Sequence, residues 1–270
     1  MAKREGVAPP ALIKEVIANA GRDLVLIGGQ ALAYWILHYR VTVPAHLPAV
    51  SRDIDFLGQA ASDQASVRRL ARRFGKAWLP GDRGLTALVG RVVVELPDDE
   101  YTTIDIVHKI AGFRSADTVR ERAVTVTLSG VDMQVMHPLD VLRSRMVNLH
   151  KLEEKQSDLG MTQLRLAIEV GRAFLAEVAA ADTGGGRPAV LRFIKAIHAF
   201  AREGAGRSVA ERFGIHVADA IDPSLIRTPE FWREYWPAVK PLMSSEYAAG
   251  FAQPELREPP STRRHRKALK

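Results

Sequence analysis

The sequence contains no cysteine in its 270 residues, which excludes disulfide bonds, thiolate metal sites and a cysteine nucleophile. No apolar run approaches the length needed to span a bilayer, so we expect no membrane segment. The charges in residues 1–6 have no apolar core behind them, which gives no sign of a secretory signal. With 47% hydrophobic and 26% charged residues, the composition is that of a soluble globular protein, which we expect in the cytoplasm.

Several catalytic signatures are also missing. Neither Gly-x-Ser-x-Gly nor Gly-x-x-x-x-Gly-Lys-Ser/Thr occurs, which removes support for an α/β-hydrolase and for a Walker-type ATPase. The eight histidines are scattered without a recognisable metal-binding spacing. His137 precedes Pro138 at an expected helix start, so we interpret it as a capping or packing residue.

Positive charge is concentrated at the C-terminal end. The net charge is +7, and the last ten residues contribute +5 of it through Arg263, Arg264, Arg266, Lys267 and Lys270. We expect residues 259–270 to form a disordered basic tail, which suits RNA or DNA but is more often merely solvated. The expected helix 62–76 presents a second basic face. This face is either a solvated surface or a binding surface for RNA.

An apolar strand is expected at residues 23–27, and a helix begins after Gly28 and Gly29. Two glycines let a ligand approach the backbone, and a helix start presents unpaired N–H groups to an anion. The pattern alone is a weak signal, because it also fits a tight turn without a ligand.

Two carboxylates, Asp53 and Asp55, stand in the apolar β-prone run 51–57. Residues two apart in a strand point to the same face, so both acids project together. Strands disfavour Asp, and like charges side by side repel, so the pair favours a bound cation. An exposed edge strand with two solvated acids is the alternative.

A third acid, Asp105, lies in another apolar strand, 102–107. If it meets Asp53 and Asp55 at one end of a sheet, the three carboxylates suit one or two Mg²⁺ ions, which prefer carboxylate and phosphate oxygens. A nucleoside triphosphate would then rest on the N–H groups of residues 29–31. Asp105 would complete the second metal site and help to deprotonate an attacking hydroxyl.

Taken in order, these motifs resemble the AbiEii-type, toxin-like branch of the polymerase-β-like nucleotidyltransferase superfamily. The run 26–32 with its Gly-Gly turn and the run 51–57 look like the first motif, and Asp105 fits the second. The run 137–142 is similar to the helix after the sheet, where a basic residue reaches the triphosphate. The resemblance implies these nucleotide-binding residues: Gly28, Gly29, Gln30, Ser51, Arg52, Arg145 and Lys155.

The chain departs from this family pattern at two places. The gap from Gly29 to Asp53 is longer than in compact members, which indicates an insertion around Pro44–Val50 that forms a lid or a substrate loop. Arg145 stands where many members carry lysine, and arginine can hold phosphate with two hydrogen bonds.

The resemblance implies an α+β fold in which a small mixed β-sheet with flanking helices, the nucleotidyltransferase fold, precedes a helical C-terminal domain. We expect a catalytic domain at 1–136 and a helical domain at 137–258. The implied activity is Mg²⁺-dependent transfer of a nucleotide from an NTP to a hydroxyl, most simply of tRNA or another RNA, by a toxin-like enzyme with a cognate antitoxin. The alternatives are a small-molecule or protein acceptor, and a degenerate, non-catalytic binding module.

Overall fold

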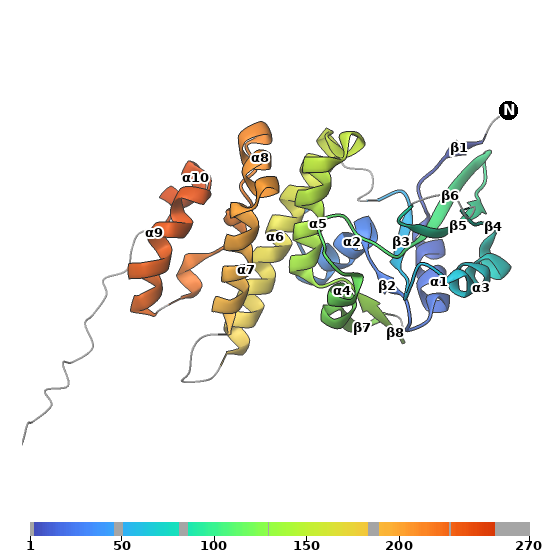
Figure 1. The fold of residues 1–270 in the computed structure, drawn as a ribbon, viewed down its shortest axis with the longest axis horizontal. Helices are drawn as coiled ribbons and strands as arrows, with labels where there is room; N and C mark the ends of the chain where they lie inside the picture. The colour runs from blue at the N-terminus through green and yellow to red at the C-terminus, as the bar shows by residue number, and fades with distance from the viewer. Residues whose placement is uncertain are drawn as a thin grey trace, which may run out of the picture.

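The computed structural model describes residues 3–45, 51–80, 86–128, 130–182, 189–226 and 228–251. Within these ranges a mixed β-sheet with flanking helices precedes a helical region, which confirms the expected α+β class (Figure 1). The predicted basic tail and residues 46–50 of the predicted insertion lie outside the described residues. None of the described helices is long and apolar enough to cross a membrane.

The described strands form one mixed sheet in the order β4-β5-β6-β3-β2-β8-β7, and β1 pairs with β6. Strand β6 runs parallel to β3 and antiparallel to β5, while β2 runs antiparallel to β3 and parallel to β8. The strands are β1 (Arg4–Glu5), β2 (Val25–Leu26), β3 (Ile54–Leu57), β4 (Lys76–Trp78), β5 (Leu88–Glu95), β6 (Glu100–Val107), β7 (Val124–Leu128) and β8 (Val131–Val135).

Helices flank this sheet and then make up the rest of the described chain. The α-helices are α1 (Pro10–Ala20), α2 (Gly28–Tyr39), α3 (Gln64–Phe74), α4 (Ala116–Arg122), α5 (Pro138–Lys151), α6 (Asp158–Ala181), α7 (Val190–Arg202), α8 (Gly204–Phe213), α9 (Trp236–Val239) and α10 (Ser245–Ala249). Shorter helical turns are η1 (Glu153–Lys155), η2 (Val217–Ala220), η3 (Pro223–Leu225), the π-helical η4 (Phe231–Tyr235) and η5 (Lys240–Leu242).

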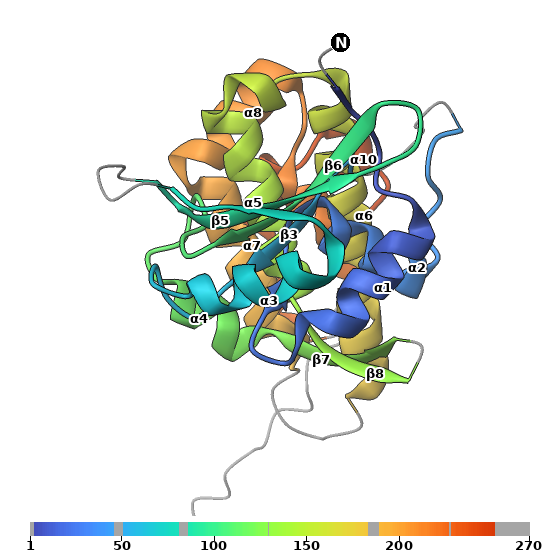
Figure 2. The same ribbon diagram turned by 90° about the vertical axis from the view of Figure 1, so that its right-hand side faces the viewer.

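The two faces of the central strands differ in character. The register partners Val92, Ile104 and Ile54 make a fully buried row across β5, β6 and β3. Figure 2 shows α1 and α3 together below β5 and β6, and α3 turns its buried Val67 and Leu70 inward. Since side chains alternate along a strand, the next residues face the opposite side, where the polar residues lie.

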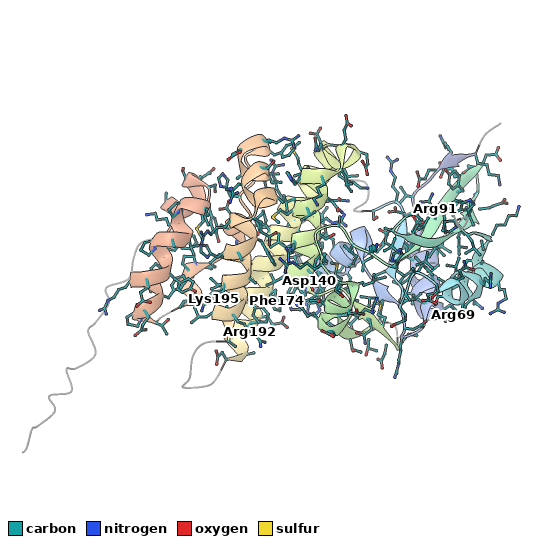
Figure 3. The ribbon with its side chains drawn as sticks, in the orientation of Figure 1. Arg69, Arg91, Asp140, Phe174, Arg192 and Lys195 are labelled. Atoms are coloured by element: carbon teal, nitrogen blue, oxygen red, sulfur yellow. The ribbon has the colours of Figure 1, made fainter. Side chains whose placement is uncertain are left out.

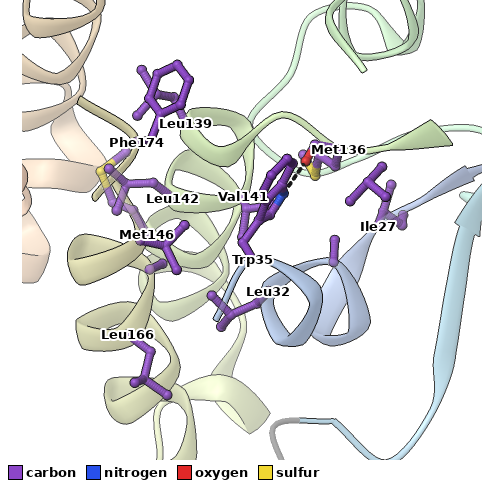
Figure 4. Packing of buried hydrophobic residues seen from close by; sticks show 14 of the residues in the cluster. Ile27, Leu32, Trp35, Met136, Leu139, Val141, Leu142, Met146, Leu166 and Phe174 are labelled. Carbon is purple, nitrogen blue, oxygen red and sulfur yellow. Dashed lines mark hydrogen bonds between the residues drawn. The ribbon is translucent and has the colours of Figure 1, made fainter. Parts of the chain in front are cut away.

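Helix α2 joins the sheet to the helical region, because it contacts β3 on one side and α5 and α6 on the other. The buried Trp35 donates from Nε1 to the carbonyl oxygen of Met136 over 2.8 Å, which ties α2 to the chain just after β8 (Figure 4). Farther on, Trp232 and Trp236 are buried, so they are core residues and not a surface on which bases could stack.

The sequence pattern favours a helical stretch from residue 137 to about 180 that divides near Gly160. In the structure the division lies at residues 152–157, and Gly160 lies in the first turn of α6. A Cβ at Gly160 would collide with the carbonyl oxygen of Lys155, so the glycine lets η1 fold back against α6. Helix α8 was not predicted, because its first three residues include Gly204 and Gly206, which usually indicate a turn.

Candidate active site

Asp55 and Asp105 are register partners on the adjacent parallel strands β3 and β6. Their side chains therefore lie on the same face of the sheet, next to each other. Asp53 precedes β3, and its Oδ1 accepts a hydrogen bond from Oγ of Ser51 over 2.8 Å. The backbone carbonyl of Asp53 accepts from Nε2 of Gln30 at 3.2 Å, which ties this run to α2.

The Gly28-Gly29 turn lies directly against this strand. A Cβ on Gly28 would overlap Oδ2 of Asp55, and a Cβ on Gly29 would overlap Oγ of Ser51. Gly28 also has a φ of +68°, in the left-handed region that favours glycine. The N–H of Ile27 donates to the carbonyl of Asp55 over 3.0 Å, which fixes the approach of the two segments.

The start of α2 presents backbone donors beside the carboxylates. The N–H of Ala31 makes the first intrahelical hydrogen bond, to the carbonyl of Ile27 at 3.2 Å. The helix therefore does not use the N–H groups of Gly28, Gly29 and Gln30. Backbone donors at the positive end of a helix dipole are suited to phosphate oxygens.

Asp55 is at the electrostatic centre of the site. Burial raises its pKa to about 7, and the neighbouring charges of Asp53 and Asp105 add to the effect. Arg145 and Lys155 act in the opposite direction and lower the pKa of Asp55, so both cations lie within electrostatic reach of the carboxylates. The fold thus brings Arg145 on α5 and Lys155 on η1 to the predicted acids.

Arg145 is buried, with 8% of its surface exposed. Its Nη1 donates to Oε1 of Gln163 over 3.2 Å, and its Nε has no hydrogen-bond partner within the described structure. Burial lowers the pKa of Arg145, whereas the charges of Asp55 and Asp53 raise it. A buried guanidinium with an unused donor near two carboxylates is suited to an anionic ligand.

Asp105 has a partner that the sequence analysis did not identify. Arg91, its register partner on β5, donates from Nε to Oδ1 over 2.7 Å and from Nη2 to Oδ2 over 2.6 Å. The hydrogen bond with Asp105 is the largest cause of the raised pKa of Arg91. Both oxygens of Asp105 are therefore held by a guanidinium. Counting back from the turn at 97–100 would have placed Arg91 opposite Asp105.

Two of the three carboxylates, those of Asp53 and Asp55, are suited to hold a divalent cation. The shared negative charge around Asp55, and the cradle that a Cβ on Gly28 would fill, suit a hard cation held by Asp53 and Asp55. Mg²⁺ is commonly bound by one or two carboxylates together with substrate phosphates. Across the described residues, no group of three acidic, histidine or cysteine side chains is arranged to hold a metal, so Asp105 as a third ligand stays a prediction.

Arg52 contributes to the described structure through its backbone. Its side chain is exposed, and its carbonyl accepts hydrogen bonds from the N–H of Ala8 at 3.0 Å and from Oγ1 of Thr102 at 2.9 Å. The backbone of Arg52 thus holds the carboxylate strand against β6 and the N-terminal segment. A side-chain contact of Arg52 with a nucleotide stays a prediction.

No family model matches the chain, and no curated protein matches it in sequence. Among solved structures, the chain is similar to an antigenic nucleotidyltransferase-like protein from Paracoccidioides brasiliensis. The identity is 11%, the match covers 71% of this chain and 95% of that chain, and the TM-score is 0.38. A TM-score of that size carries no argument about fold or function, so both rest on the geometry described above.

Proposed function

We propose that this chain is an Mg²⁺-dependent nucleotidyltransferase that moves a nucleoside monophosphate from an NTP to a hydroxyl of RNA. The observation that carries the proposal is the direct contact of the Gly28-Gly29 turn with the strand of Asp53 and Asp55. The contact supports the proposal because backbone N–H groups beside carboxylates suit a complex of a nucleotide with a divalent ion.

The nucleotide would be held by three kinds of group. The N–H groups at the start of α2 bind phosphate oxygens, and Ser51 orients Asp53 through their 2.8 Å hydrogen bond. Arg145 and Lys155 add positive charge on the side of the helical region. Asp53 and Asp55 hold the divalent ion, which supplies charge neutralisation at the phosphates when it is bound.

In the transfer step, the acceptor oxygen forms a bond to the α-phosphorus, and the bond from that phosphorus to the bridging oxygen breaks. Pyrophosphate leaves with the electron pair of the broken bond. The hydroxyl proton passes to the carboxylate of Asp105, beside Asp55 on the adjacent strand, and takes the place of one of the two hydrogen bonds from Arg91. This step assigns Asp105 the role of the base.

The test is incubation of the protein with labelled NTPs, Mg²⁺ and total tRNA. Label should move to RNA with the wild-type protein and not with Asp53→Ala. Absence of transfer by the wild type, or equal transfer by the variant, would rule out the RNA activity. A small-molecule or protein acceptor is distinguished by salt, because RNA binding weakens steeply as salt rises.

The pairing of Arg91 with Asp105 favours a second candidate, a non-catalytic binding module. A guanidinium on both oxygens of Asp105 would suit a site that has lost its third metal ligand. Such a module would itself act as a binding or antitoxin-like protein, and would bind no nucleotide in a metal-dependent way.

A further inference from the structure

A groove of about 550 Å³ lies on the polar face of the sheet, beside the carboxylates. Its wall includes Lys3, Trp78, Leu88, Arg91, Glu95 and Tyr101, from the N-terminal segment and from β4, β5 and β6. Its volume is in the range of small-molecule and nucleotide sites. None of the nucleotide-holding groups described above lines this groove.

The groove is continuous with the site through one row of side chains. Trp78 is the register partner of Arg91, which pairs with Asp105, which in turn pairs with Asp55. All four project from the same face of β4, β5, β6 and β3. Neighbouring strands lie about 4.8 Å apart, so Trp78 is about 14 Å from Asp55 along this row. The row leads from Trp78 in the groove through Arg91 to the two carboxylates.

Trp78 differs from the other tryptophans of the chain. It is 52% exposed on the short edge strand β4, whereas Trp35, Trp232 and Trp236 are at most 5% exposed. Tyr101 lies in the same groove, on β6. About half of Trp78 is open to solvent, and flat rings beside a groove are the usual surface on which unpaired bases stack.

Positive charge gathers on α3, which lies behind the edge strand that carries Trp78. Helix α3 leads into β4, and the stretch 64–76 contains five basic residues and no acidic one: Arg68, Arg69, Arg72, Arg73 and Lys76. Four of them are exposed, although Arg73 pairs with Glu15 and Lys76 lies 4.0 Å from Glu95; Arg69 is partly covered and paired with Asp23. Figure 1 places α3 beside β4, and Figure 3 labels Arg91 in the sheet and Arg69 on α3. Helix α3 packs on the opposite face of the sheet from the groove, so a strand that leaves the groove meets these cations after it passes over the edge strand β4.

We propose that the groove binds the reactive end of single-stranded RNA, with an unpaired base stacked on Trp78 and the backbone leading toward α3. The inference rests on the proposed function, since it assigns the acceptor subsite of the same reaction. Single-stranded ends suit the groove because their bases are free to stack, whereas the bases of a duplex are not. Arg91 then links the acceptor to Asp105, the residue that takes the hydroxyl proton.

Tryptophan fluorescence tests the stacking directly, because Trp78 alone of the four is open to solvent. The full-length protein is titrated with an unlabelled single-stranded oligoribonucleotide, and iodide quenching of the emission is measured. Bound RNA should protect Trp78, so the fraction of tryptophan emission that iodide can quench should disappear. Trp78→Leu should bind the RNA about tenfold more weakly, while Trp78→Phe, which keeps a flat ring, should stay close to wild type.

Leu37→Ala on α2 is the matched control, because Leu37 is another exposed apolar side chain, at 78%. It should not change RNA affinity.

Replacing Arg72 by Ala should weaken RNA binding and reduce the salt dependence of that binding by about one phosphate contact. Equal affinity of Trp78→Leu and wild type, undiminished iodide quenching, or equally tight binding of a duplex or a free nucleoside would overturn the proposal.

Two outcomes distinguish an error in the assignment of the groove from an error in the proposed transferase activity. If Asp53→Ala abolishes transfer while Trp78→Leu transfers to RNA as well as wild type, the groove assignment is wrong and the function stands. If the oligonucleotide protects Trp78 but no nucleotide is ever transferred, the groove stands and the transferase activity is wrong.

Discussion

Asp55 lies directly beside Asp105 on the adjacent parallel strand, and Arg91 holds the far side of Asp105 with two hydrogen bonds. The three side chains form one row across β3, β6 and β5. Only Asp105 is held by Arg91, so the two acids have different electrostatic surroundings. The negative charge that Asp55 shares with Asp53 and Asp105 is suited to a cation, whereas both oxygens of Asp105 already accept hydrogen bonds from Arg91.

Gly28→Ala tests the contact between the turn and the carboxylate strand. Gly28 and Gly214 both have positive φ, +68° and +62°, but a Cβ on Gly214 meets nothing within 4 Å. Each alanine should cost about 1–2 kcal/mol of folding free energy from the backbone alone. Gly28→Ala should cost more and abolish NTP binding, because its Cβ overlaps Asp55. The described contact would be contradicted if Gly28→Ala and Gly214→Ala had equal free energies of unfolding and Gly28→Ala still bound NTP.

Arg145→Met tests the buried guanidinium as a phosphate ligand. Removing its charge should lower NTP affinity at least tenfold, since charge-assisted hydrogen bonds to phosphate are among the strongest polar contacts. Arg145→Lys should recover part of that affinity. The exposed Arg165→Met on α6 is the control, and calorimetry gives the affinities. An unchanged NTP affinity in Arg145→Met would remove this residue from the site.

Arg91→Gln tests whether Asp105 can serve as a metal ligand. The guanidinium and a divalent ion compete for the same oxygens, so its loss should raise Mg²⁺ affinity several-fold. The variant should also unfold more easily, because a well-placed bidentate pair contributes about 1 kcal/mol. Titration with Mg²⁺ alone measures the affinity. If Mg²⁺ affinity stays the same, Asp105 acts only as a base and not as a ligand.

His137 and Asp140 should give opposing pH dependences of stability. Burial lowers the pKa of His137 to about 4, so the unfolded chain binds more protons there and stability rises with pH between about 4 and 6.5. Burial raises the pKa of Asp140 to about 6, so the folded chain binds more protons and stability falls with pH between about 4 and 6. Each pKa shift changes the free energy of unfolding by an amount on the order of 1–3 kcal/mol across its pH range.

The two effects partly cancel in the wild type between about pH 4 and 6. Asp140→Asn should therefore show a melting temperature that rises with pH more steeply than that of the wild type. His137→Asn, which keeps a capping side chain, should show one that falls with pH over the same window. Calorimetric melts across this range measure both slopes. Parallel slopes for wild type and both variants would contradict the assigned pKa shifts.

Local patterns predicted the capping role of His137 and the order of strand, Gly-Gly turn and helix, since spacing and turn residues act over a few positions. The α+β class followed from the family resemblance and is confirmed by the fold. The ion pair of Arg91 and the edge strand β4 were missed. Both depend on which strands pair, and the short β4 follows Gly75 where a helix was expected to continue.

The acceptor surface could not be predicted for a related reason. Trp78 and Asp55 are far apart in sequence, and only the pairing of four strands places them in one row. The positions of Arg145 and Lys155 depend likewise on how α5 and η1 pack against the sheet. Their proximity to Asp55 agrees with the sequence-based assignment, while their contact with a nucleotide stays a prediction.

Calorimetry of NTP binding, with and without Mg²⁺, tests the central claim most directly. The wild-type protein should bind at least one NTP tightly only when Mg²⁺ is present. Asp55→Asn, which removes the charge but keeps the shape of the side chain, should lose that metal-dependent binding while it remains folded. Failure of the wild type to bind any NTP with Mg²⁺, or identical binding by Asp55→Asn, would contradict a metal-nucleotide site at these carboxylates.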